Sequence, residues 1–440
     1  MKNLKNTDPA IYKLIKEEEK RQEEVLEMIA SENYTSKAVM EALGSVLTNK
    51  YSEGFPKKRY YQGNKIIDEI EIIAQERAQA LFGVPYVNVQ PLSGSPANSA
   101  VYLAILKNGD KMMALSRNFG GHITHGGDLN LSTRLFKTVH YELDSKGFLD
   151  YDAIEKQAIK EKPQLIICGF TAYPRTIDFK RFGQIADKVG AYLMADTSHI
   201  TGLIIAGVHP SPVPYAHIIT TTTHKTLRGS RGALILVTEK GLKKDPDLPK
   251  KIETAIIPGL QGGPHDNQTA AIAVALKEAS KPTFKKYGDQ IVKNAKVLAS
   301  ELVRYGFDLI SGGTDNHLLL INLQNKNVNG AVAALSLEVA GIVLNKNGVP
   351  FDPLPPYWTS GIRLGTPAIT TRGMKEKEMK KIAKWISMVI DEVKGHELPK
   401  EKEARKEYMR NFRKEVIKSK KLLSIAKEIR GLCKKFPLEG

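Results

Sequence analysis

Residues 217–237 read HIITTTTHKTLRGSRGALILV, and this stretch decides the fold. The apolar and β-branched run over 217–223 predicts a strand, and the apolar run over 232–239 predicts the next one. His224 and Lys225 follow directly after the first of these strands. Most lysines lie on solvated surfaces. A lysine that follows a β-branched run instead indicates a strand that ends at a functional site.

Helical and strand patterns alternate before this stretch, starting at about residue 65. Short apolar runs separated by helices predict an α/β fold, with a parallel type of sheet covered by helices on both faces. We expect helices at 65–82, 95–107 and 178–190, and strands at 87–90, 112–116, 163–170 and 191–196.

Three parts are expected along the chain. Asp8 and Pro9 form a helix start, so residues 1–30 are predicted to be a helical arm that runs to about Ala30. Residues 31–280 are expected to form a large α/β domain. Near residue 280 the strand and helix alternation ends, so residues 281–440 are expected to form a smaller α+β domain with a basic helical tail, whose last helices begin near Lys375.

The composition is that of an ordinary globular protein, with 42% hydrophobic and 26% charged residues in a chain of 440. No run of 18 apolar residues occurs and the amino terminus is charged, so we expect a cytoplasmic protein without a membrane anchor. The two cysteines, Cys168 and Cys433, exclude a disulfide framework and a cysteine metal site, and no metal is expected.

The formal net charge of +17 raises nucleic-acid binding as a rival function. Residues 401–440 hold 13 Lys and Arg against 6 Asp and Glu, so much of the excess lies in one segment. Apolar residues recur there at helical spacing, which predicts an amphipathic helix packed on a domain. This distribution of charge argues against nucleic-acid binding as the main function.

Polar residues follow several predicted strands, at the edge where α/β sheets bind ligands. Ser93, Gly94 and Ser95 precede a helix whose free N–H groups can hold a phosphate. Asp196 ends another strand, 29 positions before Lys225. A phosphate cradle, an acid and a lysine are the groups that a pyridoxal phosphate enzyme needs, because they hold the phosphate, the pyridine nitrogen and the carbonyl carbon.

Several longer blocks resemble the serine hydroxymethyltransferase family, from about Pro9 to Val393. The resemblance implies a fold-type I transferase, whose sheet is mixed and mostly parallel with helices on both faces. It implies an enzyme that interconverts serine and glycine with pyridoxal 5'-phosphate and passes a one-carbon unit to tetrahydrofolate or a modified pterin. It also implies a homodimer, or a dimer of dimers, with shared active sites. The blocks are IASENYTS, YSEGFPKKRYYQGN, NVQPLSGSPANSAVY, GGHITHG, AYPRTIDF, LMADTSHITGL, TTTTHKTLRGSRGALI, IPGLQGGP and TSGIRLGTPAITTRG.

The resemblance also implies roles for single residues. Lys225 would hold the cofactor covalently and Asp196 would pair with its pyridine nitrogen. His122 would lie over the ring and His199 would contact the ring hydroxyl. The remaining cofactor residues would be Ser95, Gly94 and Thr171, with Tyr51 and Gly263 reaching across from a second subunit.

Further roles concern the amino acid and the carrier. Arg363 and Ser31 would bind the substrate carboxylate, for which a guanidinium offers a bidentate fork. Glu53 would move protons between the substrate hydroxyl and the carrier. Tyr61 and Arg231 would shape the carboxylate pocket, Thr222 and His224 would orient Lys225, and the carrier side would include Asn347, Tyr60, Gly121 and Ile123.

Some positions depart from the family pattern. Arg117 and Ile123 stand where leucines usually line the folate site, and Leu92 and Asn267 stand where histidines are usual. The segment 350–361 also differs from the usual sequence. His125 is expected to have a structural role, and the histidines outside any motif are treated as ordinary polar residues: His140, His209, His317 and His396.

One alternative enzyme remains open. A threonine-type aldolase or transaldolase would share Lys225, Asp196 and Arg363 but would not need a pterin carrier. The presence of Glu53, Tyr60 and Asn347 favours the transferase over this aldolase.

Overall fold

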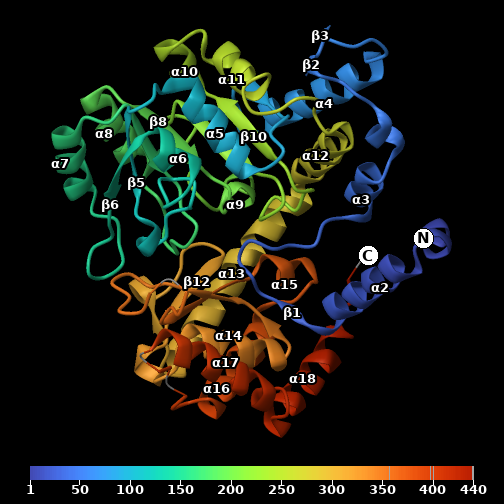
Figure 1. The fold of residues 1–440 in the computed structure, drawn as a ribbon, viewed down its shortest axis with the longest axis vertical. Coiled ribbons are helices and arrows are strands. Elements are labelled where there is room, and N and C mark those ends of the chain that lie inside the picture. Colours follow the sequence, from blue (N-terminus) through green and yellow to red (C-terminus); the bar gives the residue numbers. More distant parts are fainter. Residues whose placement is uncertain (356, 397, 400, 439–440) are drawn as a thin grey trace. The chain divides into compact units, whose positions relative to one another are not determined.

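The computed structural model describes residues 1–355, 357–396, 398–399 and 401–438. The chain divides into two compact units, and Figure 1 shows their elements. Unit 1 comprises Met1–Glu32, Lys293–Gly313 and Leu318–Gly440, and unit 2 comprises Asn33–Val292 and Thr314–His317. The division lies inside helix α13 (Pro282–Arg304), and the arm expected over 1–30 falls in unit 1.

Unit 2 is built around a mixed, mostly parallel seven-stranded sheet, as the sequence predicts. In spatial order the strands are β4 (Tyr86–Asn88), β10 (Ala233–Val237), β9 (Ile218–Thr222), β8 (Tyr192–Asp196), β7 (Leu165–Cys168), β5 (Lys111–Leu115) and β6 (Lys137–Tyr141). Strands β5 to β9 run parallel to one another, whereas β10 is antiparallel to both β9 and β4.

Both faces of this sheet are buried, because successive strand residues point to opposite faces. Ile219 packs in one apolar cluster with Phe182 of α8 (Phe179–Val189), and Ile218 packs in another with Val101 of α5 (Gly94–Ile105). The helices of unit 2 are α3 (Lys37–Leu43), α4 (Lys65–Phe82), α5 (Gly94–Ile105), α6 (Leu131–Leu135), α7 (Tyr151–Glu161), α8 (Phe179–Val189), α9 (Thr201–Ile205), α10 (Glu239–Lys244), α11 (Leu248–Ile256), α12 (Asp266–Ala279) and the first part of α13. A short hairpin joins β2 (Gly54–Phe55) to β3 (Lys58–Arg59).

Unit 1 contains a smaller antiparallel sheet and its own apolar core. In spatial order the strands are β11 (Asp308–Leu309), β12 (Leu318–Asn322), β15 (Gly361–Gly365) and β14 (Asn345–Asn347), and β1 (Leu26–Glu27) pairs separately with β13 (Ile342–Val343). Its helices are α1 (Lys2–Thr7), α2 (Pro9–Glu24), α14 (Gly330–Val339), α15 (Pro367–Thr371), α16 (Glu376–Glu392), α17 (Lys402–Val416) and α18 (Lys420–Cys433), with the last part of α13.

The start of α2 is confirmed and its end is corrected. Asp8 caps the helix by accepting a hydrogen bond from the amide of Ile11 at 3.0 Å, and Pro9 is the first helical residue. The helix ends at Glu24, not near Ala30. The following residues extend as β1, because their backbone groups pair with β13. Strand pairing thus replaces the helix that the charged sequence predicted.

The basic carboxy-terminal segment forms two helices, α17 and α18. The apolar positions of α18 are buried in the core of unit 1, as an amphipathic helix requires, and they include Leu422, Ile425, Ile429 and Leu432. Much of the segment's charge is carried by exposed lysines and arginines on the other faces.

Candidate active site

Lys225 lies in the turn between β9 and β10, and its amine is held at the end of β9. The amide of Gly229 donates to the carbonyl of Thr223 at 2.7 Å, which closes the turn. The side-chain amide of Asn33 donates to the Lys225 carbonyl at 2.9 Å. Lys225 Nζ donates to Thr222 Oγ1 at 2.8 Å. The turn and the threonine hydroxyl therefore fix both the backbone and the amine of this lysine.

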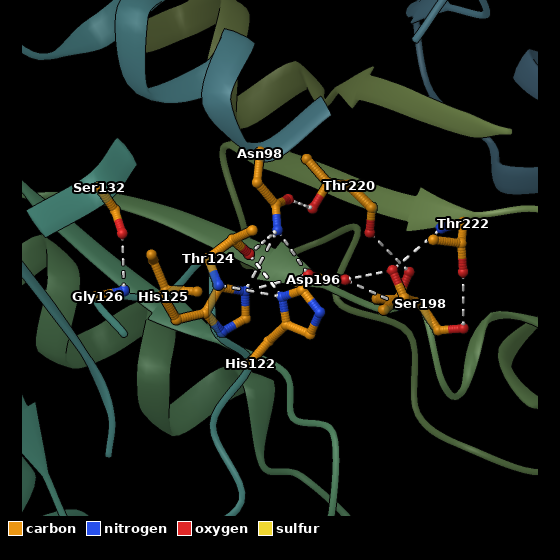
Figure 2. A network of polar contacts seen from close by, with 12 residues as sticks. Asn98, His122, Thr124, His125, Gly126, Ser132, Asp196, Ser198, Thr220 and Thr222 are labelled. Atoms are coloured by element: carbon orange, nitrogen blue, oxygen red, sulfur yellow. Dashed lines mark hydrogen bonds and ion pairs between the residues drawn. The ribbon is translucent and has the colours of Figure 1, made fainter. Parts of the chain in front are cut away.

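Asp196 ends β8 and is the centre of the polar network in Figure 2. Its Oδ2 accepts a hydrogen bond from Asn98 Nδ2 at 2.9 Å and lies 3.1 Å from His125 Nε2. Its Oδ1 accepts from Ser198 Oγ at 2.6 Å. Burial alone would raise the pKa of Asp196, but the hydrogen bond and charge of His125, with smaller contributions from His122 and Ser198, hold it well below its usual range. Asp196 is therefore ionised at neutral pH.

Ser198 joins the acid to the lysine through one chain of hydrogen bonds, which Figure 2 shows as far as Thr222. Its hydroxyl donates to Asp196 and accepts from the amide of Thr222 at 3.0 Å. Thr222 in turn accepts from Lys225. The ends of β8 and β9 are neighbours in the sheet. These hydrogen bonds consequently fix the distance between the Asp196 carboxylate and the Lys225 amine.

The amino terminus of α5 offers a cradle for an anion beside β9. The helix begins at Gly94, and a Cβ added there would lie 2.7 Å from the Thr222 methyl group. Only glycine fits this approach. The first N–H groups of a helix have no partner within the helix and favour a phosphate. Ser95, in the same turn, is exposed.

His122 and His199 are held by neighbouring side chains of unit 2. His122 Nδ1 lies 2.7 Å from Thr124 Oγ1, in the loop after β5. The His199 ring stacks on His317, with ring centroids 5.6 Å apart. The amide of Thr171 donates to the carbonyl of Gly120 at 2.8 Å, which ties its loop to that of His122.

The loop before α4 carries four of the predicted residues, Tyr51, Glu53, Tyr60 and Tyr61. Tyr51 Oη donates to Glu53 Oε2 at 3.3 Å, and its ring lies edge-on to that of Tyr61 at 4.9 Å. A Cβ added to Gly263 would lie 3.2 Å from the Tyr51 ring. Tyr51, Tyr60 and Tyr61 are all exposed.

The remaining predicted residues of unit 2 occupy different environments. His224 is half-buried, and burial together with the charges of Lys225 and Arg231 lowers its pKa to about 3, so it is neutral at physiological pH. Arg231 and Ile123 are exposed. Gly121 has no room for a side chain, since a Cβ there would lie 2.0 Å from the Leu115 carbonyl oxygen.

Arg363, Asn347 and Ser31 belong to unit 1. Arg363 lies on β15, is only 7% exposed, and donates from Nε to Asn345 Oδ1 at 3.1 Å. Burial lowers the pKa of Arg363 to about 10, so the guanidinium stays charged at neutral pH. Asn347 donates to the carbonyl of Gly348 at 2.7 Å, and Ser31 is half-buried.

Several residues that contact the predicted site residues had no predicted site role, among them Asn98, His125, Ser198 and His317. The structural role expected for His125 is more specific than foreseen, because this side chain contacts the ionised acid directly. Its position three residues after His122 was the one signal available. His317 is distant in sequence from every motif and gave none.

Two kinds of feature are absent from the described part of the chain. No group of three or more His, Cys, Asp and Glu residues is arranged to hold a metal ion. No helix there is both long and apolar enough to cross a membrane.

The chain is similar to known proteins along most of its length. The family model described as serine hydroxymethyltransferase matches residues 4–386. A protein from Desulfotalea psychrophila named serine hydroxymethyltransferase is 51% identical over 440 residues, covering 100% of this chain and 96% of that protein. One of the same name from Legionella pneumophila strain Corby is 53% identical over 391 residues, covering 89% of this chain and 93% of that protein. The chain therefore belongs to the serine hydroxymethyltransferase family.

Proposed function

We propose that this enzyme interconverts serine and glycine with pyridoxal phosphate and transfers the hydroxymethyl carbon to tetrahydrofolate or a related reduced pterin. The observation that carries the proposal is the hydrogen-bonded chain from Asp196 through Ser198 and Thr222 to Lys225. The ionised acid and the amine lie on adjacent strand ends, where they would meet the pyridine nitrogen and the carbonyl carbon of the cofactor, respectively. Family membership supports the reaction, and the chemistry of these groups supports the cofactor.

The residues around this series of hydrogen bonds fit the cofactor. When bound, pyridoxal phosphate supplies an electron sink for cleavage next to the amino group. Asp196, held ionised by its neighbours, would keep the pyridine nitrogen protonated. Lys225 would hold the carbonyl carbon, and the start of α5 at Gly94 would hold the phosphate. His122, His199, Thr171 and Ser95 would complete the contacts.

Other residues would bind the amino acid and move protons. Arg363 and Ser31 would take the carboxylate of serine, and Tyr61 and Arg231 would shape the pocket around it. Glu53 would move a proton at the substrate hydroxyl, a task for a positioned carboxyl group. His224 stays neutral and would orient Lys225 together with Thr222. Asn347, Tyr60, Gly121 and Ile123 would face the carrier.

The first prediction tests whether a carrier is needed. Purified enzyme loaded with pyridoxal phosphate should cleave serine at least about tenfold faster with tetrahydrofolate than without, because the carrier accepts the one-carbon unit at the site. Arg117 is exposed and can pair with a carboxylate of the carrier's tail. The apparent carrier affinity should therefore fall as salt is raised from 50 to about 500 mM.

The assay measures glycine and the one-carbon product, with a modified pterin as a parallel arm. A β-hydroxy amino acid cleaved without a carrier is the control, since it reports the cofactor site alone. If no pterin accelerates serine cleavage while this control reaction proceeds, the threonine-type aldolase becomes the better assignment.

We also propose a homodimer, with a dimer of dimers as the larger alternative. Segment 40–73 of unit 2 exposes large apolar side chains, and α3 and α4 both contact α12, which leaves their outer faces uncovered. Exposed apolar patches of this kind mark protein interfaces. The exposed side chains are Met40, Leu43, Val46, Tyr51, Tyr60, Tyr61, Ile66 and Ile73.

The second prediction follows from this surface. Val46, which is 80% exposed, should tolerate glutamate in a monomer but not in a buried interface. Val46→Glu should raise the dimer dissociation constant at least about tenfold, because burying an unpaired charge is costly. Light scattering coupled to gel filtration measures the change. Ile159→Glu, on the exposed face of α7, is the matched control and should keep the dimer. A parent protein that is monomeric would contradict the proposal.

The cytoplasmic location expected from the sequence stays a prediction.

A further inference from the structure

Arg59 is a buried arginine beside a loop of exposed tyrosines. It ends the hairpin of β2 and β3, and its side chain is only 4% exposed, whereas the next two residues, Tyr60 and Tyr61, are both exposed. A buried arginine has to be fully paired, because an uncompensated buried charge is costly. Its partners therefore show what the arginine holds in place.

The guanidinium holds the backbone on both sides of Glu53. Arg59 Nη1 donates to the carbonyl of Ser52 at 2.8 Å and to the carbonyl of Gly54 at 2.8 Å. These are the two residues that flank Glu53 in the chain. A third contact, from the amide of Tyr60 to the carbonyl of Glu53 at 3.0 Å, spans the hairpin. The peptide that carries the Glu53 side chain is thus bound at successive carbonyls.

The other nitrogens of Arg59 are anchored on α4. Nε donates to Asp68 Oδ1 at 2.9 Å and Nη2 donates to Glu71 Oε2 at 2.6 Å. The Glu71 side chain is itself buried. Gln90 Nε2 donates to Glu71 Oε1 at 2.8 Å and to the Gly54 carbonyl at 3.0 Å. A planar fork with five donors suits such a set of partners, and lysine cannot reproduce it.

Two further features restrict the same loop, the backbone conformation of Gly54 and a hydrogen bond of Ser52. Gly54 has φ of +102°, and a Cβ there would lie 2.5 Å from the Lys58 carbonyl oxygen, so the hairpin accepts only glycine. Ser52 Oγ donates to Asp266 Oδ1 at 2.6 Å, and both side chains are buried. The backbone around Glu53 is therefore fixed by α4 and α12, while Glu53 as a residue is half-buried and its carboxylate accepts a hydrogen bond from Tyr51.

We propose that Arg59 is a positioning residue that acts through Glu53, by bracketing its backbone so that the carboxyl group is presented at a fixed point. Glu71 and Gln90 complete the anchor. The inference rests on the proposed role of Glu53 in proton transfer. An acid on an unanchored loop would sample many positions, and a misplacement of about 1 Å can lower a rate about 100-fold.

A double-mutant cycle tests the proposal in the enzyme loaded with pyridoxal phosphate. Arg59→Lys keeps a positive charge but cannot span both carbonyls and both carboxylates. It should lower kcat for tetrahydrofolate-dependent serine cleavage by roughly 10- to 100-fold. In the Glu53→Gln background the same substitution should cost less than about threefold, because the group it positions is already gone. Equal losses in both backgrounds would overturn the proposal.

Hydrogen–deuterium exchange gives a readout that does not depend on activity. Amides of residues 52–61 should exchange at least about tenfold faster in Arg59→Lys, and other strands should keep the parent rates. Arg77→Lys is the matched control, since Arg77 lies on the same helix and donates to a backbone carbonyl, that of Ala273, at 2.7 Å. Arg77→Lys should change neither the amide exchange rates of residues 52–61 nor kcat, whether in the parent or in the Glu53→Gln background. Unchanged exchange in Arg59→Lys would overturn the bracketing.

A second variant covers the case in which Arg59→Lys does not fold. Glu71→Gln leaves the guanidinium and both carbonyl contacts in place but weakens the anchor, so it should show the same non-additivity with Glu53→Gln at a smaller loss. Additive losses would again overturn the role of Arg59. Full carrier-dependent activity of Glu53→Gln would instead reject the proton-transfer role of Glu53, and the two failures are therefore distinguishable.

Discussion

Lys225→Ala is expected to lower kcat for serine and glycine interconversion by roughly 10³-fold or more, the order of loss seen when a covalent catalytic group is removed. The physical reason lies in the geometry of β9. Its end presents one amine, held by Thr222 at 2.8 Å, and the neighbouring threonines cannot replace a nucleophilic nitrogen. The same substitution should remove the absorbance above ~400 nm that a lysine-bound pyridoxal phosphate gives.

Steady-state assays and an absorbance spectrum after incubation with pyridoxal phosphate measure both effects. Lys188→Ala is the control, because Lys188 is an exposed lysine of the same unit that pairs with Glu155 on the surface. It should keep parent activity and colour. A parent protein that shows no absorbance above ~400 nm after loading would refute the assignment of Lys225.

The large α/β unit was predictable because its signals are local and repeated. Strand β8 is a short apolar run between helices and β9 is a β-branched run, and their polar ends lie at one edge of the sheet by topology alone. This is how Asp196 and Lys225 could be paired from sequence, although they are 29 positions apart. The end of α2 was not predictable in this way. Its residues favour helix, and only the non-local pairing of β1 with β13 stops it at Glu24.

The partners of the site residues were largely hidden for the same reason. Asn98 contacts Asp196 from α5, and His317 stacks on His199 from a segment beyond α13. Neither has a spacing that a helix or strand period could detect. Arg59 is a clear case, since it sits in a stretch of charged and aromatic residues that reads as solvated loop. Only the folded chain shows that its side chain is buried against two carboxylates.

Arg363→Lys is expected to weaken serine binding by about 2–5 kcal/mol, or roughly 30-fold to several thousand-fold in KM. Arg363 is charged, buried on β15 and oriented by Asn345, so its fork is set before a carboxylate arrives. Lysine keeps the charge but offers a single point donor on a flexible stem, which cannot form two parallel hydrogen bonds.

The measurement separates binding of the amino acid from binding of the cofactor. Serine titrations of the loaded enzyme give the first, and pyridoxal phosphate affinity, expected within about threefold of the parent, gives the second.

Arg372→Lys is the control for removing a buried arginine from unit 1. Arg372 donates to five backbone carbonyls, of Gln22, Glu23, Val25, Cys433 and Phe436. Its replacement should therefore lower the melting temperature by several degrees and leave the serine KM unchanged. If Arg363→Lys also loses only stability, the carboxylate of serine binds elsewhere, and the planar fork on β15 is a structural group like that of Arg372.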